Sequence, residues 1–493
     1  MASFLDKLYR LVWGMPALVL IAGVGLYLTL RTRFAQFRLF PAACRNFWLR
    51  LTGKETSAEG VSPFQALCTA LAATVGTGNL AGVAGALAIG GPGAIFWMWV
   101  CALLGMVTKL AEATLAVRYR ISENGELLGG PMYTISRGMG KRWKFLAGIY
   151  AFFGIIAAFG VGNATQINTV IAGVNDCITA FGGSISRRSD LLMGLGLAIL
   201  VLLLFLGGAK RIGAAAEKIV PFAAAAYLLM GVAVLVLRFE AIPGAIGAIF
   251  RGALDPHAVT GGMIGSLMIT MRIGVSRGVF TNEAGMGTAG IAHGSANVRH
   301  PVEQGLMGIV EVFLDTVVIC TMTALVILCS GVPVPYGTDA GVSLTADAFS
   351  YVLGPWVKVF IAASLCLFAF ATILGWGLYG ARCAQYLFGR SAWKQFAVLQ
   401  AMTVVIGAVL NTAVIWQMAE IVNGLMAIPN LISLAVLAPE LTRLVNEYNA
   451  GRKAGGGTLC KFPSTQTAAS PLPCENSTPS LWKPNSGERK FTT

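Results

Sequence analysis

The chain has 493 residues, of which 56% are hydrophobic and only 12% charged, and its formal net charge is +14. Soluble globular proteins carry roughly 25% charged residues, so this composition indicates a membrane protein. The basic residues lie mostly between apolar runs, and the positive-inside rule therefore explains them better than nucleic-acid binding does. The ten cysteines show no CxxC or metal-ligand spacing, which indicates neither a disulfide framework nor a zinc site.

The first apolar run, Leu11–Leu30, follows Lys7 and Arg10 and superficially resembles a signal peptide. The run is about as long as a helix must be to cross a bilayer. No convincing small-residue cleavage site follows it. We therefore expect a retained transmembrane helix, followed by a basic cytoplasmic loop, over residues 1–62.

Ten further apolar segments follow, so the sequence predicts an all-α membrane protein with about eleven transmembrane helices. They lie near 63–88, 92–117, 144–174, 190–208, 217–238, 258–291, 303–330, 356–387, 395–415 and 417–438. Two of them, 258–291 and 356–387, exceed the roughly 20 residues that a straight crossing needs, so we expect a tilt or a break in each. Residues 455–493 are rich in Gly, Ser, Thr, Pro and Lys and are predicted to form a disordered cytoplasmic tail.

The loop charges predict the orientation in the membrane. Lys and Arg concentrate in 31–60, 117–144, 210–218 and 382–394, which all fall on one side of an eleven-span arrangement. Cytoplasmic loops carry the excess of Lys and Arg. The N-terminus is therefore predicted to lie outside, and the C-terminus in the cytoplasm, of a multi-pass protein of the cell inner membrane.

The most informative segment is Gly76-Thr77-Gly78-Asn79, inside the apolar run 63–88. Glycine is poorly suited to a helix interior, so the segment should break the helix at membrane depth. Unwound backbone is tolerated there only when it is buried in protein or lines a cavity, and secondary transporters bind substrate and ion at such breaks. Helix packing through small residues is the alternative, but it does not require the asparagine.

A second glycine-rich stretch, Phe280–Gly290, lies five spans after the first. Paired breaks at corresponding positions of two halves indicate an inverted-repeat transporter. Gly285-x-Gly287-x-x-Gly290 also matches the dinucleotide-binding fingerprint. The sequence shows no strand–helix–strand unit around it, so we reject that reading.

The first break predicts two kinds of contact. Free N–H groups at Thr77-Gly78, at the start of a half-helix, suit an amino-acid carboxylate because the helix dipole favours an anion there. Free carbonyls near Ala72, Thr74 and Val75 suit a small hard cation, which takes oxygen ligands. Asn79 offers a carbonyl oxygen to ion or substrate without a fixed charge.

Several motifs between about residue 10 and residue 445 form a distinctive set: Ala72–Gly82, Gly90–Trp99, Gly129–Tyr133, Arg277–Gly285, Ile291–His293, His300-Pro301 and Thr372–Trp376. Together they resemble the alanine/glycine:cation symporter family. The resemblance implies the five-plus-five inverted-repeat fold shared with neurotransmitter:sodium symporters. In that scheme 63–238 and 258–438 are the two repeats, and 11–30 is an added N-terminal helix.

The resemblance also implies where the substrate binds: at Gly76–Asn79, Gln166, the region of Phe280, and Trp376. Gln166 is a polar residue in an apolar span and could equally join two helices. Trp376 would keep the pocket small and favour alanine or glycine, although a membrane tryptophan can also serve packing alone.

By the same resemblance, sodium would lie between the carbonyls of Ala72 and Val75 and the segment 356–387. The family typically has a Ser-Thr pair in that segment, whereas this chain has Ala371-Thr372. One hydroxyl is missing, so Thr372 must act with backbone carbonyls or water.

Seven charged residues fall within apolar segments, where isolation in lipid is costly. Opposite signs are present, so interhelical pairs are the expected role, and a proton-carrying role for Glu311 or Asp315 is the alternative. His293 and His300 are expected near a cytoplasmic mouth as solvated or packing residues. The seven are Lys109, Glu112, Arg272, Arg277, Glu283, Glu311 and Asp315.

The paired breaks thus predict a secondary active transporter, and the resemblance implies that it carries alanine or glycine into the cell with sodium, by alternating access. A proton-coupled or glutamine-preferring symporter is the alternative. An enzyme would need a converging nucleophile and base, and an ATP-driven pump would need a P-loop; the sequence indicates neither. The expected partners are the amino acid, the sodium ion and the lipid bilayer, with no other cofactor and no nucleic acid. The oligomeric state is not determined, and a monomer is compatible with the sequence.

Overall fold

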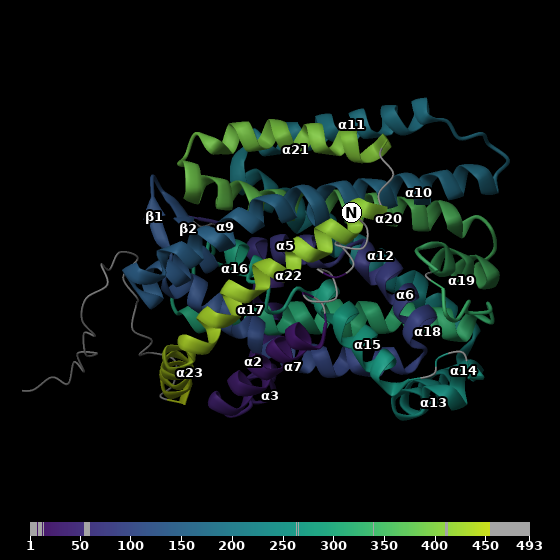
Figure 1. Cartoon of the computed structure of the whole chain (residues 1–493), viewed down its shortest axis with the longest axis horizontal. Coiled ribbons are helices and arrows are strands. Elements are labelled where there is room, and N and C mark those ends of the chain that lie inside the picture. Colours follow the sequence, from purple (N-terminus) through teal and green to yellow (C-terminus); the bar gives the residue numbers. More distant parts are fainter. Residues whose placement is uncertain are drawn as a thin grey trace, which may run out of the picture.

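A computed structural model describes residues 14–53, 60–262, 264, 266–338, 340–409 and 413–453, together with Lys7 and Val12. The predicted disordered tail, 455–493, lies outside the described residues. The described chain folds into a helical bundle in which segments far apart in the sequence pack together (Figure 1). The only strands among these residues are β1 (Ile121–Glu123) and β2 (Glu126–Leu128), which pair antiparallel with Ile121 opposite Leu128.

Each apolar segment expected from the sequence contains helix. The first half comprises α2 (Met15–Arg31), α3 (Ala35–Arg38), α4 (Phe40–Thr52), α5 (Pro63–Thr74), α6 (Val83–Gly90), α7 (Gly93–Arg118), α8 (Pro131–Tyr133), α9 (Lys144–Phe159), α10 (Thr165–Ala180), α11 (Arg187–Phe205), α12 (Gly208–Leu237), α13 (Ile242–Leu254) and α14 (Pro256–Thr260). The second half comprises α15 (Leu267–Asn282), α16 (Thr288–His293), α17 (Pro301–Val312), α18 (Thr321–Ser330), α19 (Ser343–Leu353), α20 (Val357–Phe388), α21 (Ala392–Val409), α22 (Ala413–Val436) and α23 (Ala438–Lys453).

Wider π-helical turns connect several of these helices, at Gly78–Gly82, Thr134–Met139, Gly160–Ala164 and Phe313–Cys320. Short 3₁₀ turns lie at Lys141–Trp143 and Phe239–Ala241. Single π-helical turns inside α-helices are frequent at functional sites. Three of the four, at 78–82, 160–164 and 313–320, meet at the site described below.

In the described part of the chain, seven helical segments are long and apolar enough to cross a membrane. Two bent pairs raise that number to nine if each pair is one span. One of these is the pair around the first predicted break, where Pro63–Thr74 and Gly78–Gly90 meet at 50°. The helix α2 is shorter, and the expected total of eleven spans stays a prediction.

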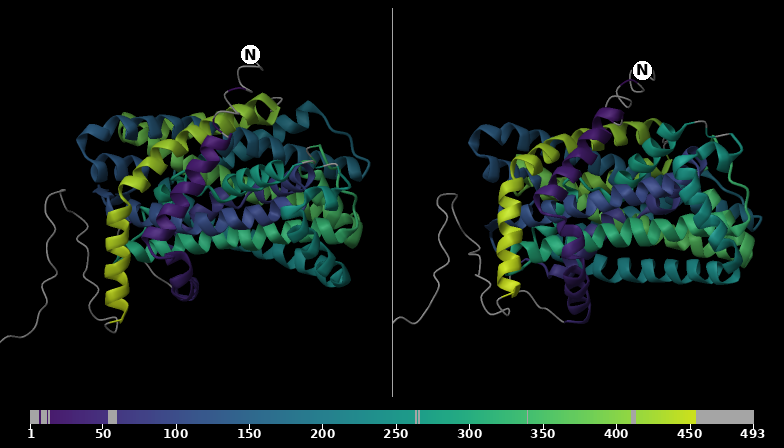
Figure 2. Two further views of the ribbon diagram at one scale, coloured as in Figure 1. Left: turned by 60° about the horizontal axis from the view of Figure 1, so that its bottom comes forward. Right: turned by 90° about the horizontal axis from the view of Figure 1, so that it is seen from below.

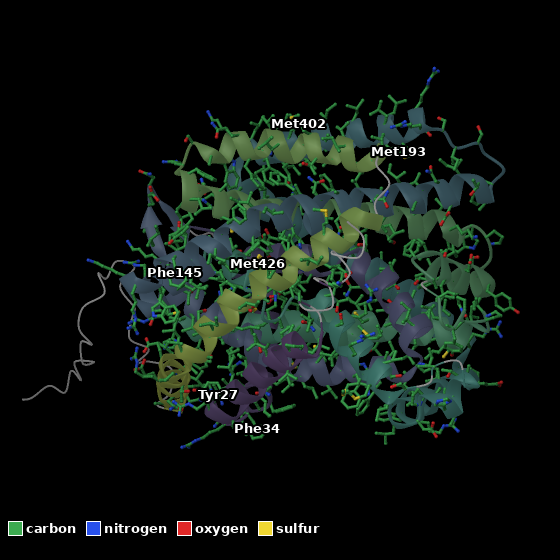
Figure 3. The ribbon with its side chains drawn as sticks, viewed as in Figure 1. Tyr27, Phe34, Phe145, Met193, Met402 and Met426 are labelled. Carbon is green, nitrogen blue, oxygen red and sulfur yellow. The ribbon has the colours of Figure 1, made fainter. Side chains whose placement is uncertain are left out.

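Large apolar side chains cover the outside of the bundle. Figure 3 shows Tyr27, Phe34, Phe145 and Met402 at its periphery, and Phe145 is 62% exposed. Soluble monomers rarely expose so much apolar surface, so this surface suits contact with lipid. The helix α23 carries more charge and turns away from α22 at 60° (Figure 2), and Arg118 of α7 pairs with its Glu440 at 3.0 Å.

Local sequence signals start the helices that carry the site. Ser62 and Gln65 form a capping box at the start of α5: the Gln65 N–H donates to Ser62 Oγ (3.1 Å), and the Ser62 N–H donates to Gln65 Oε1 (3.3 Å). Pro63 and Pro301 occupy the first turns of α5 and α17, where a missing N–H costs nothing. The long helix α20 packs against α5, α9 and α10 and so reaches the centre of the bundle.

Candidate functional site

The first break interrupts the helix between α5 and α6 through the side chain of Asn79. The N–H of Gly76 donates to Asn79 Oδ1 at 2.8 Å, and the N–H of Asn79 donates to the Gly76 carbonyl at 3.3 Å. In a continuous α-helix these two N–H groups would donate to the carbonyls four residues earlier, those of Ala72 and Val75. At the break, these two N–H groups therefore donate to other acceptors than the carbonyls of Ala72 and Val75. These are the two carbonyls that the family resemblance assigns to sodium.

Asn79 in turn is held by Asp315, which lies on the π-helical turn Phe313–Cys320. Asn79 Nδ2 donates to Asp315 Oδ1 at 2.7 Å, and Thr316 donates its hydroxyl to Asp315 Oδ2 at 2.9 Å. Both Asn79 and Asp315 are fully buried. From the sequence, Asp315 is expected as an intramembrane charge, either in an interhelical pair or as a proton carrier, and not as part of the binding site. The structure adds this carboxylate to the site and uses the Asn79 oxygen to hold the break.

Two of the predicted substrate residues outside the break, Gln166 and Phe280, lie beside it. Thr77 donates its hydroxyl to Gln166 Oε1 at 3.0 Å, and Gln166 Nε2 donates to the Val161 carbonyl at 3.0 Å. A methyl group placed on Gly78 would lie 3.7 Å from the ring of Phe280. The structure thus brings Gln166 and Phe280 next to the unwound segment.

The helix α20 brings Thr372 to the first break, and it brings Trp376 to the π-helical turn Gly160–Ala164 and to Glu283. A methyl group on Gly76 would lie 2.6 Å from Thr372 Oγ1, so only glycine admits this approach. A methyl group on Gly162, in the π-helical turn before α10, would lie 2.2 Å from Trp376 Cβ. Ala371 packs in one apolar cluster with Ala72 and Val75, and it places a methyl group where a second hydroxyl was expected from the family.

The second break, between α15 and α16, is filled by the protein's own carboxylates. Glu283 adopts a left-handed backbone conformation (φ 53°), and its carboxylate accepts from Trp376 Nε1 at 2.7 Å and from the Thr288 hydroxyl at 2.6 Å. Glu112 Oε1 accepts from the N–H groups of Gly285 and Gly287, each at 2.9 Å. Buried carboxylates therefore brace both breaks, Asp315 at the first and Glu112 and Glu283 at the second.

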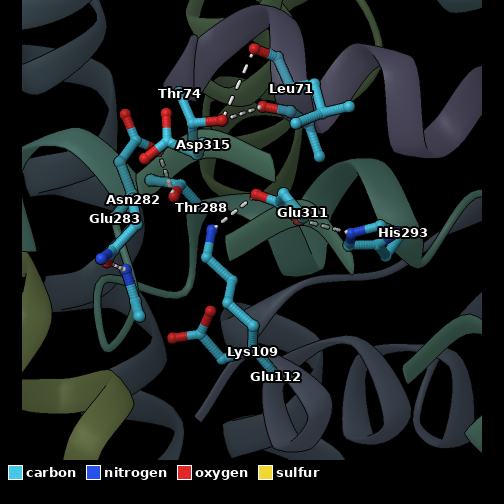
Figure 4. Close-up of polar contacts among 12 residues, drawn as sticks. Leu71, Thr74, Lys109, Glu112, Asn282, Glu283, Thr288, His293, Glu311 and Asp315 are labelled. Carbon is cyan, nitrogen blue, oxygen red and sulfur yellow. Dashed lines mark hydrogen bonds and ion pairs between the residues drawn. The ribbon is translucent and has the colours of Figure 1, made fainter. Parts of the chain in front are cut away.

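The remaining buried charges form an interhelical group (Figure 4). Lys109 of α7 pairs with Glu311 of α17 at 2.9 Å, and both side chains are fully buried. His293 Nε2 contacts the other Glu311 oxygen at 2.9 Å, and its Nδ1 contacts Gln304. The prediction of interhelical pairs is confirmed for Lys109 and Glu311. Of the two roles expected for His293, solvated or packing, the solvated one is excluded, because the side chain is buried and Glu311 and Gln304 supply partners for both ring nitrogens.

The described residues include no group of three or more His, Cys, Asp and Glu side chains placed to hold a metal ion. The oxygen atoms around the first break are carbonyls, amides and hydroxyls, with one carboxylate. Such a set suits a weakly held monovalent cation better than a tightly bound transition metal, which prefers imidazole or thiolate ligands.

Comparisons with known proteins match almost the whole chain. Residues 1–461 match the Sodium:alanine symporter family. The chain is 42% identical to the Sodium/alanine symporter AgcS of Methanococcus maripaludis over 456 residues, which cover 92% of this chain and 98% of that protein. It is 36% identical to the Probable sodium/glutamine symporter GlnT of Bacillus subtilis over 451 residues, 90% of each protein.

The fold is also similar to that of a solved protein. The crystal structure of MhsT in complex with L-phenylalanine gives a TM-score of 0.55 at 15% identity and covers 79% of this chain and 99% of that one. This likeness confirms the predicted fold class, an all-α fold like that of sodium-coupled neurotransmitter symporters. The predicted repeat boundaries, 63–238 and 258–438, stay a prediction.

Proposed function

This chain belongs to the sodium:alanine symporter family, and we propose that it carries alanine or glycine into the cell together with sodium. It is a transporter and not an enzyme. The main support for the proposal is the first break. There the N–H groups of Gly76 and Asn79 donate within the break and not to the carbonyls of Ala72 and Val75, as they would in a continuous helix. A site built from backbone dipoles needs no catalytic group to bind an ion and a zwitterion together.

The amino acid is proposed to bind at the start of the half-helix that follows the break. Its carboxylate would meet the N–H groups of Thr77 and Gly78, where the helix dipole favours an anion. Gln166 lies within hydrogen-bond distance of the Thr77 hydroxyl and would orient the substrate. The rings of Phe280 and Trp376 would close the pocket around a small side chain.

Sodium is proposed to bind to the carbonyls of Ala72 and Val75, with the hydroxyl of Thr372 as a third ligand. The Thr74 hydroxyl is turned back to the carbonyls of Ala70 and Leu71, at 3.3 and 3.5 Å, so Thr74 would contribute through its backbone. Asn79 would act mainly by holding the segment in shape. Together these groups supply the oxygen ligands that a hard cation takes.

Transport is proposed to proceed by alternating access around this fixed site. From the Lys- and Arg-rich loops, the N-terminus is proposed to lie outside and the C-terminus in the cytoplasm, with the protein in the cell inner membrane. The broken helices α5–α6 and α15–α16 would rock against the rest of the bundle. A glutamine-preferring symporter is a second candidate, favoured by the similarity to GlnT.

Uptake into proteoliposomes tests the proposal. Labelled L-alanine, D-alanine, glycine and glutamine would be supplied while sodium and proton gradients are imposed separately. We expect an inward sodium gradient to drive accumulation of alanine and glycine above equilibrium. Equal accumulation with and without any ion gradient would contradict symport, and accumulation of glutamine alone would favour the second candidate.

A further inference from the structure

A cavity of about 370 Å³ opens between α10, α19 and α20, away from the first break. Its volume is within the range of about 300–1,000 Å³ that is usual for small-molecule sites. Three charged side chains line it, Asp176, Asp347 and Lys358, above an apolar wall that includes Ile361 and Leu365. By the predicted topology this is the end of the bundle that is poor in basic loops, and hence the outer end.

The cavity lies on the same helix faces as the proposed transport site. Along α10, Gly173 follows Gln166 by two turns, and Asp176 follows Gly173 by nearly one more. Along α20, Leu365 and Lys358 precede Thr372 by two and four turns. Residues seven apart share a helix face, so these two faces connect the cavity to the break.

A tight contact between two helices forms part of the cavity wall. A methyl group on Gly173 would lie 2.6 Å from Leu365 Cδ1, so α10 and α20 touch at this level. The third wall, α19, also contacts the broken helix, because the Thr345 hydroxyl donates to the Leu80 carbonyl at 3.1 Å. The helix α19 therefore contacts both the cavity and the broken helix.

The charges of the cavity match a zwitterion. Lys358 Nζ lies 3.1 Å from Asp347 Oδ1, and the Asp347 side chain is 52% exposed. An exposed pair of this kind contributes little, so Lys358 can exchange Asp347 for the carboxylate of a ligand. Asp176, which lines the same cavity, can accept from the ammonium group of that ligand.

We infer that the cavity between α10, α19 and α20 is a second, weaker binding site for zwitterionic amino acids on the uptake route. Asp176 contacts the ammonium group, and Lys358 contacts the carboxylate. The inference rests on the proposed function, because it takes the transported amino acid as the ligand. The cavity is open and polar at its rim, so it holds its ligand less tightly than the deeper site.

Equilibrium binding of tritiated L-alanine to the purified full-length protein tests the inference. We expect wild type to show two classes of site, and Asp176→Asn and Lys358→Met each to remove the weaker class and leave the tighter one. Glu240→Gln, an exposed carboxylate outside the cavity, is the matched control and should keep both classes. Retention of the weaker class in both Asp176→Asn and Lys358→Met would overturn the inference.

Initial uptake rates provide the second readout. We expect Asp176→Asn to lower kcat/KM for alanine about tenfold, as for loss of one charge-assisted contact, with the maximal rate unchanged. An unchanged kcat/KM would remove the cavity from the uptake route and overturn the inference. Loss of wild-type uptake with the weaker class retained would contradict only the proposed function. Normal wild-type uptake without a weaker class would contradict only the cavity.

Discussion

Exchanging the two groups that hold the first break tests the arrangement most directly. Asn79→Asp keeps an acceptor for the Gly76 N–H but replaces the amide that donates to Asp315 at 2.7 Å. The lost hydrogen bond to a charged group is worth about 1.5–3 kcal/mol. Two carboxylates in contact would add roughly 4 kcal/mol of repulsion at an effective dielectric constant of 20. We therefore expect sodium-driven alanine uptake at pH 7 to fall at least ~100-fold, because 1.4 kcal/mol is already a factor of ten.

The reciprocal double variant Asn79→Asp/Asp315→Asn should restore much of the uptake. It reverses the direction of the hydrogen bond and keeps one negative charge and one acceptor for the Gly76 N–H. Asn175→Asp is a matched control, because Asn175 also donates to an aspartate, Asp190, at 3.0 Å, but near the surface. That pair is only part-buried and lies outside the proposed site, so we expect a smaller effect on uptake there than at Asn79.

The assay is initial-rate uptake of labelled alanine in proteoliposomes, corrected for the amount of folded protein by size-exclusion chromatography. Wild-type uptake by Asn79→Asp would refute the claim that Asn79 and Asp315 hold the break. A double variant that is no better than the single one would show that the hydrogen bond is not what matters.

Three further outcomes are expected. Lys109→Met leaves Glu311 buried without its cation and should lower the free energy of unfolding by about 3–5 kcal/mol. The double variant Lys109→Met/Glu311→Leu should recover part of this loss. Equal denaturation midpoints for wild type and Lys109→Met would contradict the expectation. Ala371→Ser adds the missing hydroxyl beside the proposed sodium site and should lower the sodium concentration needed for half-maximal alanine uptake; a weaker sodium dependence would count against that ion position. Trp376→Phe removes the donor to Glu283 and should lower the free energy of unfolding by about 1–3 kcal/mol. Denaturant unfolding in detergent measures this change. An unchanged free energy of unfolding would show that the hydrogen bond makes no net contribution to stability.

Local sequence was sufficient to locate the breaks. Gly76 and Gly78 within an apolar run, followed by Asn79, predict an unwound segment. Glycine weakens a helix, and this effect depends only on residues close together in the sequence. The structure places Asn79 Oδ1 on the Gly76 N–H, three residues away, a contact that such a local argument can reach. The second break at Phe280–Gly290 was found by the same reasoning.

The partners of the polar side chains were beyond that reasoning. Asn79 meets Asp315, Lys109 meets Glu311, and Trp376 meets Glu283, pairs that are 236, 202 and 93 residues apart. Apolar composition shows that an intramembrane charge needs a partner, but it does not say which one. Several opposite charges were available, so the choice had to come from helix packing.

The amino-acid sequence by itself determined the membrane class of this protein, the position of its two breaks and the family to which it belongs, because hydrophobic length, glycine placement and motif identity are all local properties. Only the tertiary structure decided that the first break is held by Asn79 and Asp315, while Glu112 and Glu283 fill the second. The physical reason is that a buried polar group must find its partner in the interior, and which partner it meets depends on how helices that are distant in the sequence pack together.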